Sequence, residues 1–273
     1  MLPIYRAIAV DQEAIVSGST KPCIMTVADS DGKIVGDYVV KVFKPTSIEQ
    51  SQPTNKEVYG NILARAFDLV VPKPALVRVG RDVIDSLNSS ERYRNFHLLP
   101  GVYFGSEYLN NVLDYSGAVD MKLEFWEEET IFAFDALIRN IDRRIRKPNL
   151  FFKDGTVHLI DHELSLQLHG KTFDEMCKER EKHWKFMNLD DPELRREHLF
   201  LERLRERNKK NLVTFDTFRE YLRVLDVDLL DEYAAQLDST GNDSSDLLEI
   251  KPYLESVKQN PDQFIQILQE LIA

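Results

Sequence analysis

The sequence predicts an α+β fold of two lobes, in which the N-terminal lobe is an antiparallel β-sheet with one main helix and the C-terminal lobe is mostly helical. Residues 4–44 contain three runs rich in β-branched and aromatic residues, which is typical of strands. A helical pattern follows them, and residues 171–273 carry apolar residues at the spacing of several short helices. Because 273 residues are enough for two lobes around a cleft, we expect the lobes at 1–109 and 110–273.

The composition favours a cytoplasmic protein. Hydrophobic residues make up 43% and charged residues 30% of the chain, and no apolar run reaches the roughly 18 residues that span a membrane. Cys23 and Cys177 lie too far apart in sequence to suggest a disulfide framework, so a reducing compartment fits. The net charge of −11 repels phosphate backbones, and we therefore expect no direct binding to nucleic acid.

The strands of the first lobe are IYRAIAV, PCIMTV and KIVGDYVVKVF, separated by the turn sequences SGST and DSDG. A helix is expected at 54–68, because the apolar residues of this stretch form one stripe. VPKPALVRV then returns as an extended strand. GVYFGSEYL is expected to lead out of the lobe, which places a hinge near residues 104–110.

The second lobe is expected to begin with an amphipathic helix that starts near Trp126. A polar, basic loop follows at 140–149, and a hairpin, NLFF-KDGT-VHLID, occupies 149–161. Its Asp154-Gly155 pair is a strong signal for a two-residue hairpin turn. The turn therefore fixes the register of the hairpin.

That register brings three polar residues together. Counting back from the turn places Asn149 nearly opposite Ile160 and Asp161 at the open end of the hairpin, and Asp142 lies in the loop that leads to this end. Two oxygen ligands suit Mg²⁺, and a nearby carboxylate can accept the proton of a hydroxyl group. Taken singly, the three residues could cap a turn, bond to backbone or end a strand. Their convergence favours phosphoryl transfer.

Two charged residues of the first lobe form a second candidate. Lys41 shares a strand face with apolar residues, so it needs a partner or a phosphate, unless it lies on an edge and reaches water. Glu57 could be that partner, although Thr54-Asn-Lys-Glu57 also fits a capping box at the start of the helix. In the order strand lysine, then helix glutamate, the pair favours nucleotide binding.

Two further features are weaker. The turn Ser17, Gly18, Ser19 and Thr20 could offer backbone N–H groups to phosphates, but it matches neither the Walker pattern nor the glycine-rich kinase loop. The second feature is a basic run, which could bind an acidic substrate or a phosphorylated loop, or could simply be a solvated loop. It comprises Arg139, Arg143, Arg144, Arg146 and Lys147.

The order of VVKVF, NKEVYGNILARAFDLVVPKPALV, FGSEYL, FDALIRNIDRRIRKPNLFF and VHLIDHE resembles the HipA-like kinases, and most of all their small stand-alone branch. The branch has a catalytic stretch of the form N-x-D-R-x-x-x-x-P-N-L followed by L-I-D-H. The resemblance covers about residues 10–170. It implies a bilobal protein-kinase-like fold and ATP- and Mg²⁺-dependent phosphorylation, usually of a protein serine or threonine.

By this resemblance Asp142 is expected to be the catalytic base, and Asn149 and Asp161 the metal ligands. Lys41 would bind the α- and β-phosphates of ATP, and Glu57 would hold Lys41.

The resemblance also assigns the hinge residues Glu107, Tyr108 and Leu109 to adenine. The chain departs from ordinary protein kinases in two ways: the catalytic Asp-to-Asn spacing is 149 − 142 = 7 rather than five, and His162-Glu163 replaces Phe-Gly after the metal aspartate. A switch driven by that phenylalanine is therefore not expected. Founding members act with a DNA-binding partner, but nothing in this sequence marks such a partner surface.

Two other functions remain open at this point. The chain could be a kinase-fold enzyme for a small molecule or lipid, or an ATP-binding pseudokinase that only binds other proteins. A deep acidic pocket beyond Asp142 would favour a cationic small molecule, and a shallow groove would favour a protein. The retained polar residues argue against a pseudokinase.

Overall fold

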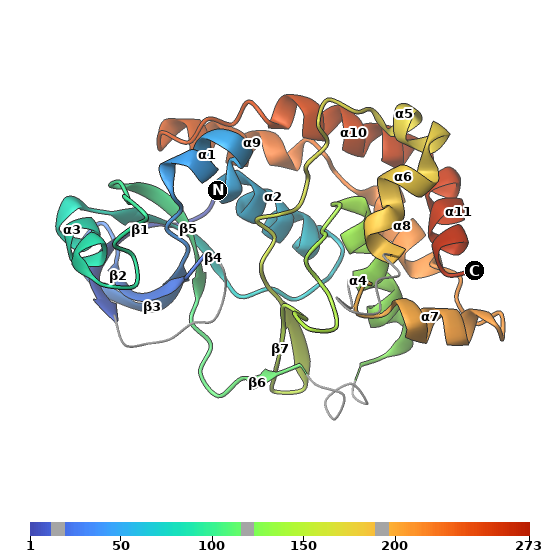
Figure 1. Ribbon diagram of the computed structural model, residues 1–273, viewed down its shortest axis with the longest axis horizontal. Helices are drawn as coiled ribbons and strands as arrows, with labels where there is room; N and C mark the ends of the chain where they lie inside the picture. Colours follow the sequence, from blue (N-terminus) through green and yellow to red (C-terminus); the bar gives the residue numbers. More distant parts are fainter. Residues whose placement is uncertain (12–19, 116–122, 189–196) are drawn as a thin grey trace. The chain divides into compact units, whose positions relative to one another are not determined.

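The computed structural model describes residues 1–11, 20–115, 123–188 and 197–273 (Figure 1). This part of the chain forms a mixed α+β structure with two compact units. The first unit consists of Met1–Tyr59, Pro72–Asn110 and Asp231–Ser245, and the second consists of Gly60–Val71, Asn111–Leu230 and Asp246–Ala273.

The first unit is built on a closed five-stranded barrel in the order β1-β2-β3-β5-β4. Its strands are β1 (Ile4–Asp11), β2 (Cys23–Ala28), β3 (Ile34–Val40), β4 (Pro74–Val79) and β5 (Gly101–Glu107). Neighbouring strands run antiparallel except β1 and β4, which are parallel. The expected antiparallel sheet is therefore wrong at one pairing. β1 and β3 are both antiparallel to β2, and β3 and β4 are both antiparallel to β5, so the closing pair must be parallel. Closure leaves the barrel without free edges.

Apolar side chains fill the barrel, as alternation along the strands requires. Met25, Val27 and Val77 are fully buried in this core, and helix α3 (Arg81–Ser89) packs Ile84 and Leu87 against it.

Two further helices, α1 (Pro45–Ser51) and α9 (Leu229–Ser239), belong wholly or mostly to this unit, and α2 (Pro53–Ala66) contributes its first half. The side chain of Gln236 in α9 both accepts from and donates to the backbone of Leu2, at 2.8 and 2.7 Å. The amide of Asn242 donates to the carbonyl of Val102 in β5. These bonds fix a stretch from late in the chain onto the barrel.

The second unit combines a small antiparallel sheet with most of the helices. Its strands are β6 (Leu113–Asp114), β7 (Leu150–Lys153) and β8 (Thr156–Leu159). Its helices are α4 (Phe125–Leu137), α5 (Phe173–Lys178), α6 (Arg180–Trp184), the 3-10 helix η2 (Lys185–Asn188), α7 (Leu201–Asn208), α8 (Asp216–Val224), α10 (Leu247–Gln259) and α11 (Pro261–Leu271). Phe67 stacks on Phe218 with ring centroids 4.8 Å apart, and Phe134 packs beside Phe67. Every residue of α4 from Thr130 to Leu137 is buried.

The β7–β8 hairpin has the register that its turn predicts. Lys153 pairs with Thr156 and Leu150 with Leu159, and Asp154 and Gly155 both have positive φ, as a type I′ turn needs. Beyond the last pair, the N–H of Ile160 donates to the carbonyl of Asn149 at 3.1 Å.

Within the described ranges, every helix is too short or too polar to cross a membrane.

Candidate active site

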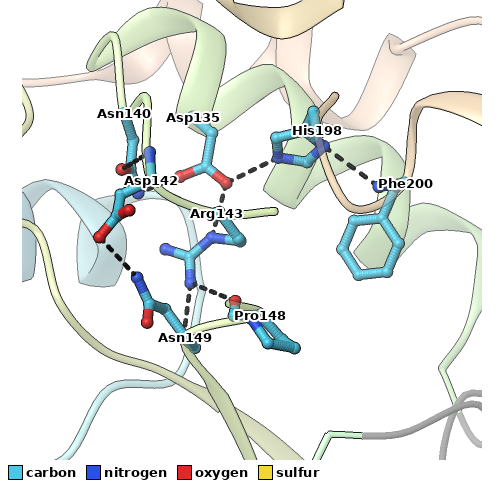
Figure 2. Close-up of polar contacts among 8 residues, drawn as sticks. All are labelled: Asp135, Asn140, Asp142, Arg143, Pro148, Asn149, His198 and Phe200. Atoms are coloured by element: carbon cyan, nitrogen blue, oxygen red, sulfur yellow. Dashed lines mark hydrogen bonds and ion pairs between the residues drawn. The ribbon is translucent and has the colours of Figure 1, made fainter. Parts of the chain in front are cut away.

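The loop between α4 and β7 places Asp142 beside Asn149 (Figure 2). The backbone N–H of Asp142 donates to the side-chain oxygen of Asn140 at 3.1 Å, which fixes the start of the loop. The amide of Asn149 lies 3.4 Å from the Asp142 carboxylate. The two residues are therefore together in space although seven positions separate them in sequence.

Asp161 joins this pair through Lys147. The Lys147 ammonium lies 2.5 Å from the Asp142 carboxylate and 2.9 Å from the Asp161 carboxylate, so one cation bridges both acids. Burial alone would lower the pKa of Lys147, but Asp161 and Asp142 more than offset it and raise the pKa above its ordinary value. Lys147 therefore stays charged. In the sequence, Lys147 stands out only as part of the basic run.

The backbone at both metal-ligand candidates is unusual. Asn149 has φ of 50° and Asp161 has φ of 68°, which is the left-handed region that few residues other than glycine adopt. Asn and Asp tolerate it best, but it still costs free energy, and such strain concentrates at functional sites. Both residues turn the chain at the open end of the β7–β8 hairpin.

A glycine in α2 makes room for the residue after Asp161. A Cβ added to Gly60 would lie 2.5 Å from the Cβ of His162, closer than side chains ever pack. Glycine inside a helix costs about 1 kcal/mol relative to alanine. Here it allows the chain that follows the hairpin to pack directly on the second half of α2.

A buried polar group that the sequence patterns did not predict lies beneath the loop. Asp135, on α4, is fully buried and accepts hydrogen bonds from Asn140 at 2.9 Å, Arg143 at 2.6 Å and His198 at 2.9 Å (Figure 2). Burial would raise the pKa of Asp135, but Arg143 and His198 outweigh burial and hold the pKa below its usual range. A lone carboxylate within the apolar stretch IFAFDAL of α4 was the sequence signal of such a network.

The solvated-loop interpretation of the basic run is wrong for Arg143. Arg143 is only 1% exposed, and besides Asp135 it donates to the carbonyl of Asn149 at 2.6 Å. Arg144 bonds to the carbonyl of Ile141, and Arg146 is exposed. Arg143 can be buried because the Asp135 carboxylate compensates its charge. Asp135 lies on α4 rather than in the loop, so the loop sequence alone does not show this partner.

In the first unit, Lys41 and Glu57 form an ion pair. β3 ends at Val40, and the N–H of Lys41 continues the pairing by donating to the carbonyl of Phe104 at 3.3 Å. Both side chains are largely buried, 11% and 2% exposed. The capping-box reading of Glu57 is wrong, because α2 begins at Pro53 and so Thr54 lies inside the helix rather than at its cap.

The remaining candidates lie in the same unit or outside the described residues. Glu107 ends β5 and its N–H donates to the carbonyl of Lys73 at 2.9 Å, and the N–H of Tyr108 donates to that of Asp37 at 2.9 Å. Leu109 follows them and is partly buried.

Of the proposed phosphate turn, Ser17, Gly18 and Ser19 lie outside the described residues. Thr20 is partly buried in a turn before β2.

Comparison with known proteins identifies the family of the chain. The family model described as HipA-like kinase matches residues 10–185. No curated protein matches the sequence significantly. Among solved structures, a Helicobacter pylori proinflammatory kinase, CtkA, is similar over 97% of this chain and 95% of its own, with a TM-score of 0.50 and 13% sequence identity. That likeness shows a shared fold. Because the family model matches well over half of the chain, the chain belongs to the HipA-like kinase family and is a kinase.

Proposed function

We propose that the protein transfers the γ-phosphoryl group of ATP to a serine or threonine hydroxyl of a protein, with Mg²⁺ and with Asp142 as the base. The observation that carries the proposal is the convergence of Asp142, Asn149 and Asp161 at one hairpin end, with Lys147 bridging the two carboxylates. Phosphoryl transfer needs positioned oxygen ligands, positive charge and one proton acceptor, and these residues supply them.

Asp142 has the position for a base. Its carboxylate is oriented by the Asn149 amide and by Lys147, and its backbone is fixed by Asn140. A carboxylate held in this way can orient a substrate hydroxyl and accept its proton as the bond to phosphorus forms. Lys147 adds a permanent positive charge next to the acids, which stabilises the charge of a transferring phosphoryl group.

Asn149 and Asp161 fit Mg²⁺ by their chemistry. Amide and carboxylate oxygens are the ligands that this hard cation prefers, and it leaves room for phosphate oxygens. That the Asp161 carboxylate already takes a cationic ammonium group at 2.9 Å supports its role as an anionic ligand. When bound, Mg²⁺ would neutralise phosphate charge.

Lys41 is the proposed contact for the α- and β-phosphates, and Glu57 holds its ammonium in place. The proposed adenine contact is the backbone of residues 107–109. Because the N–H groups of Glu107 and Tyr108 already donate to carbonyls, such a contact would use the N–H of Leu109 or carbonyl oxygens.

The test is incubation of the purified protein with γ-labelled ATP and Mg²⁺, alone and with a heat-inactivated cell extract that contains proteins, lipids and small molecules. Phosphorylated residues are then identified by mass spectrometry. We expect labelled serine or threonine, either on this chain or on another protein. Labelled lipids or small molecules with unlabelled protein would instead assign the kinase to those substrates.

Nucleotide binding gives an independent measurement. A ligand at about 100 times its dissociation constant stabilises the folded state by roughly 2.7 kcal/mol. For a protein of this size, ATP with Mg²⁺ at millimolar concentration is therefore expected to raise the melting temperature by several degrees. An unchanged melting temperature would contradict nucleotide binding.

Replacing Lys41 is expected to weaken the use of ATP while the fold stays intact. The cleanest change is Lys41→Met together with Glu57→Gln, because it removes both charges and does not leave a buried carboxylate without this counter-ion. We expect a higher KM for ATP and a smaller thermal shift. Lys33→Ala, which removes an exposed lysine in the β2–β3 turn, is the matched control. If the double variant uses ATP as the parent does, Lys41 has a structural role only.

A further inference from the structure

His198 comes from a part of the sequence that showed no sign of chemistry, yet it lies against the base of the catalytic loop. It precedes α7 and is only 3% exposed. Its Nε2 lies 2.9 Å from the Asp135 carboxylate, and its Nδ1 lies 3.2 Å from the backbone N–H of Phe200 (Figure 2).

These two contacts define the state of the ring. The N–H of Phe200 can only donate, so Nδ1 must accept and carries no proton. Nε2 then carries the proton and donates a hydrogen bond to the Asp135 carboxylate. Burial lowers the pKa of His198, which agrees with a neutral ring. The ring of Phe132 packs edge-on against it at 5.0 Å and holds its plane.

Asp135 connects His198 to both ends of the catalytic loop through hydrogen bonds. One of its oxygens accepts from Asn140, whose side-chain oxygen in turn accepts the backbone N–H of Asp142. The other oxygen accepts from Arg143, which donates to the carbonyl of Asn149. The base and one metal-ligand candidate are thus each two hydrogen bonds away from Asp135.

The backbone around His198 is also tied to the loop. The N–H of Leu199 donates to the carbonyl of Arg143 at 3.2 Å, and His198 forms an isolated antiparallel bridge with Arg144. The segment 198–200 therefore contacts the loop through backbone and side chain together.

We propose that His198 is a positioning residue: through Asp135 it holds the 140–149 loop so that Asp142 and Asn149 keep the geometry that phosphoryl transfer requires. The catalytic part of this proposal rests on the proposed function. The positioning part concerns the loop itself and can be measured without any activity.

Two amide substitutions separate the two contacts of the ring. The amide nitrogen of His198→Gln reaches the place of Nε2 and can still donate to Asp135. The oxygen of His198→Asn reaches the place of Nδ1 and can still accept from Phe200, but the donor to Asp135 is lost.

Because small displacements of reacting groups lower rates strongly, His198→Asn is expected to lower kcat about tenfold or more with KM for ATP little changed. His198→Gln is expected to keep kcat within about threefold of the parent.

Hydrogen exchange supplies the second measurement. Loss of a hydrogen bond to a charged group is expected to speed amide exchange in residues 140–149 about tenfold in His198→Asn and much less in His198→Gln. Phe173→Leu is the control, because it loosens the packing among Trp184, Tyr253 and Phe264 without removing a hydrogen-bond partner of Asp135. It should lower the melting temperature without changing kcat or exchange in 140–149.

The proposal is wrong if His198→Asn accelerates exchange only around residues 198–208, or if its kcat equals that of the parent. If His198→Asn does not fold, His198→Phe, which keeps an aromatic ring but removes both the donor to Asp135 and the acceptor for Phe200, takes its place in both measurements. If the parent protein transfers no phosphate, the proposed function fails, and exchange in the loop still decides whether His198 positions it.

Discussion

Asp142→Asn is expected to lower phosphoryl transfer by about 10²–10⁴-fold, the usual contribution of a general base. The substitution keeps the shape of the side chain and removes the proton acceptor and one charge. Lys147 retains Asp161 as a partner in this variant, so the loop should stay folded. Nucleotide binding in the presence of Mg²⁺ should persist, because Asp142 is proposed to contact the substrate hydroxyl rather than the metal.

Asp161→Asn is the matched comparison, since it makes the same chemical change at the other carboxylate that the Lys147 ammonium contacts. It removes an anionic ligand from a doubly charged cation, so it is expected to weaken the dependence of nucleotide affinity on Mg²⁺. Nucleotide affinity measured against Mg²⁺ concentration for both variants separates the roles. If Asp142→Asn loses metal-dependent binding while Asp161→Asn keeps it, the two roles are reversed. Unchanged activity in both variants would place the chemistry elsewhere.

Asp135→Ala is expected to destabilise the protein by about 3–5 kcal/mol, the usual cost of breaking a buried ion pair by removing one partner. The cost arises because Arg143 would stay buried with its charge uncompensated by that carboxylate. His198 and Asn140 would also lose their acceptor. Urea unfolding at neutral pH measures the effect as a lower midpoint.

Glu202→Ala is the control for Asp135→Ala. It removes the partner of Arg205 on α7, where the glutamate side chain is 58% exposed. Exposed pairs of this kind contribute at most about 1 kcal/mol, so the midpoint should barely move. Equal losses in the two variants would show that the Asp135 network contributes no more to stability than a surface pair. Asp135→Leu together with Arg143→Met removes both charges and should recover part of the loss.

Local sequence signals determined the hairpin and hence much of the candidate site. The Asp154-Gly155 turn specifies its own backbone angles and the pairing on either side of it. The position of Asn149 opposite Ile160 follows from that pairing alone. Apolar periodicity likewise predicted α2 close to its observed bounds and the mixed α+β class. Each of these features depends on residues a few positions apart, whose preferences are visible in one stretch of sequence.

Only the tertiary structure showed how distant segments meet. Nothing in the strand runs indicates that β1 and β4 close a barrel in parallel, because this pairing depends on the path of the whole chain. The charge of Arg143 looked solvated because its partner, Asp135, lies on another element, and His198 joins them from 63 positions beyond Asp135. Sequence patterns thus determined the chemical groups of the candidate site. The network that holds them in place was decided by long-range packing, since a buried charge is stable only where separate elements bring its partners together.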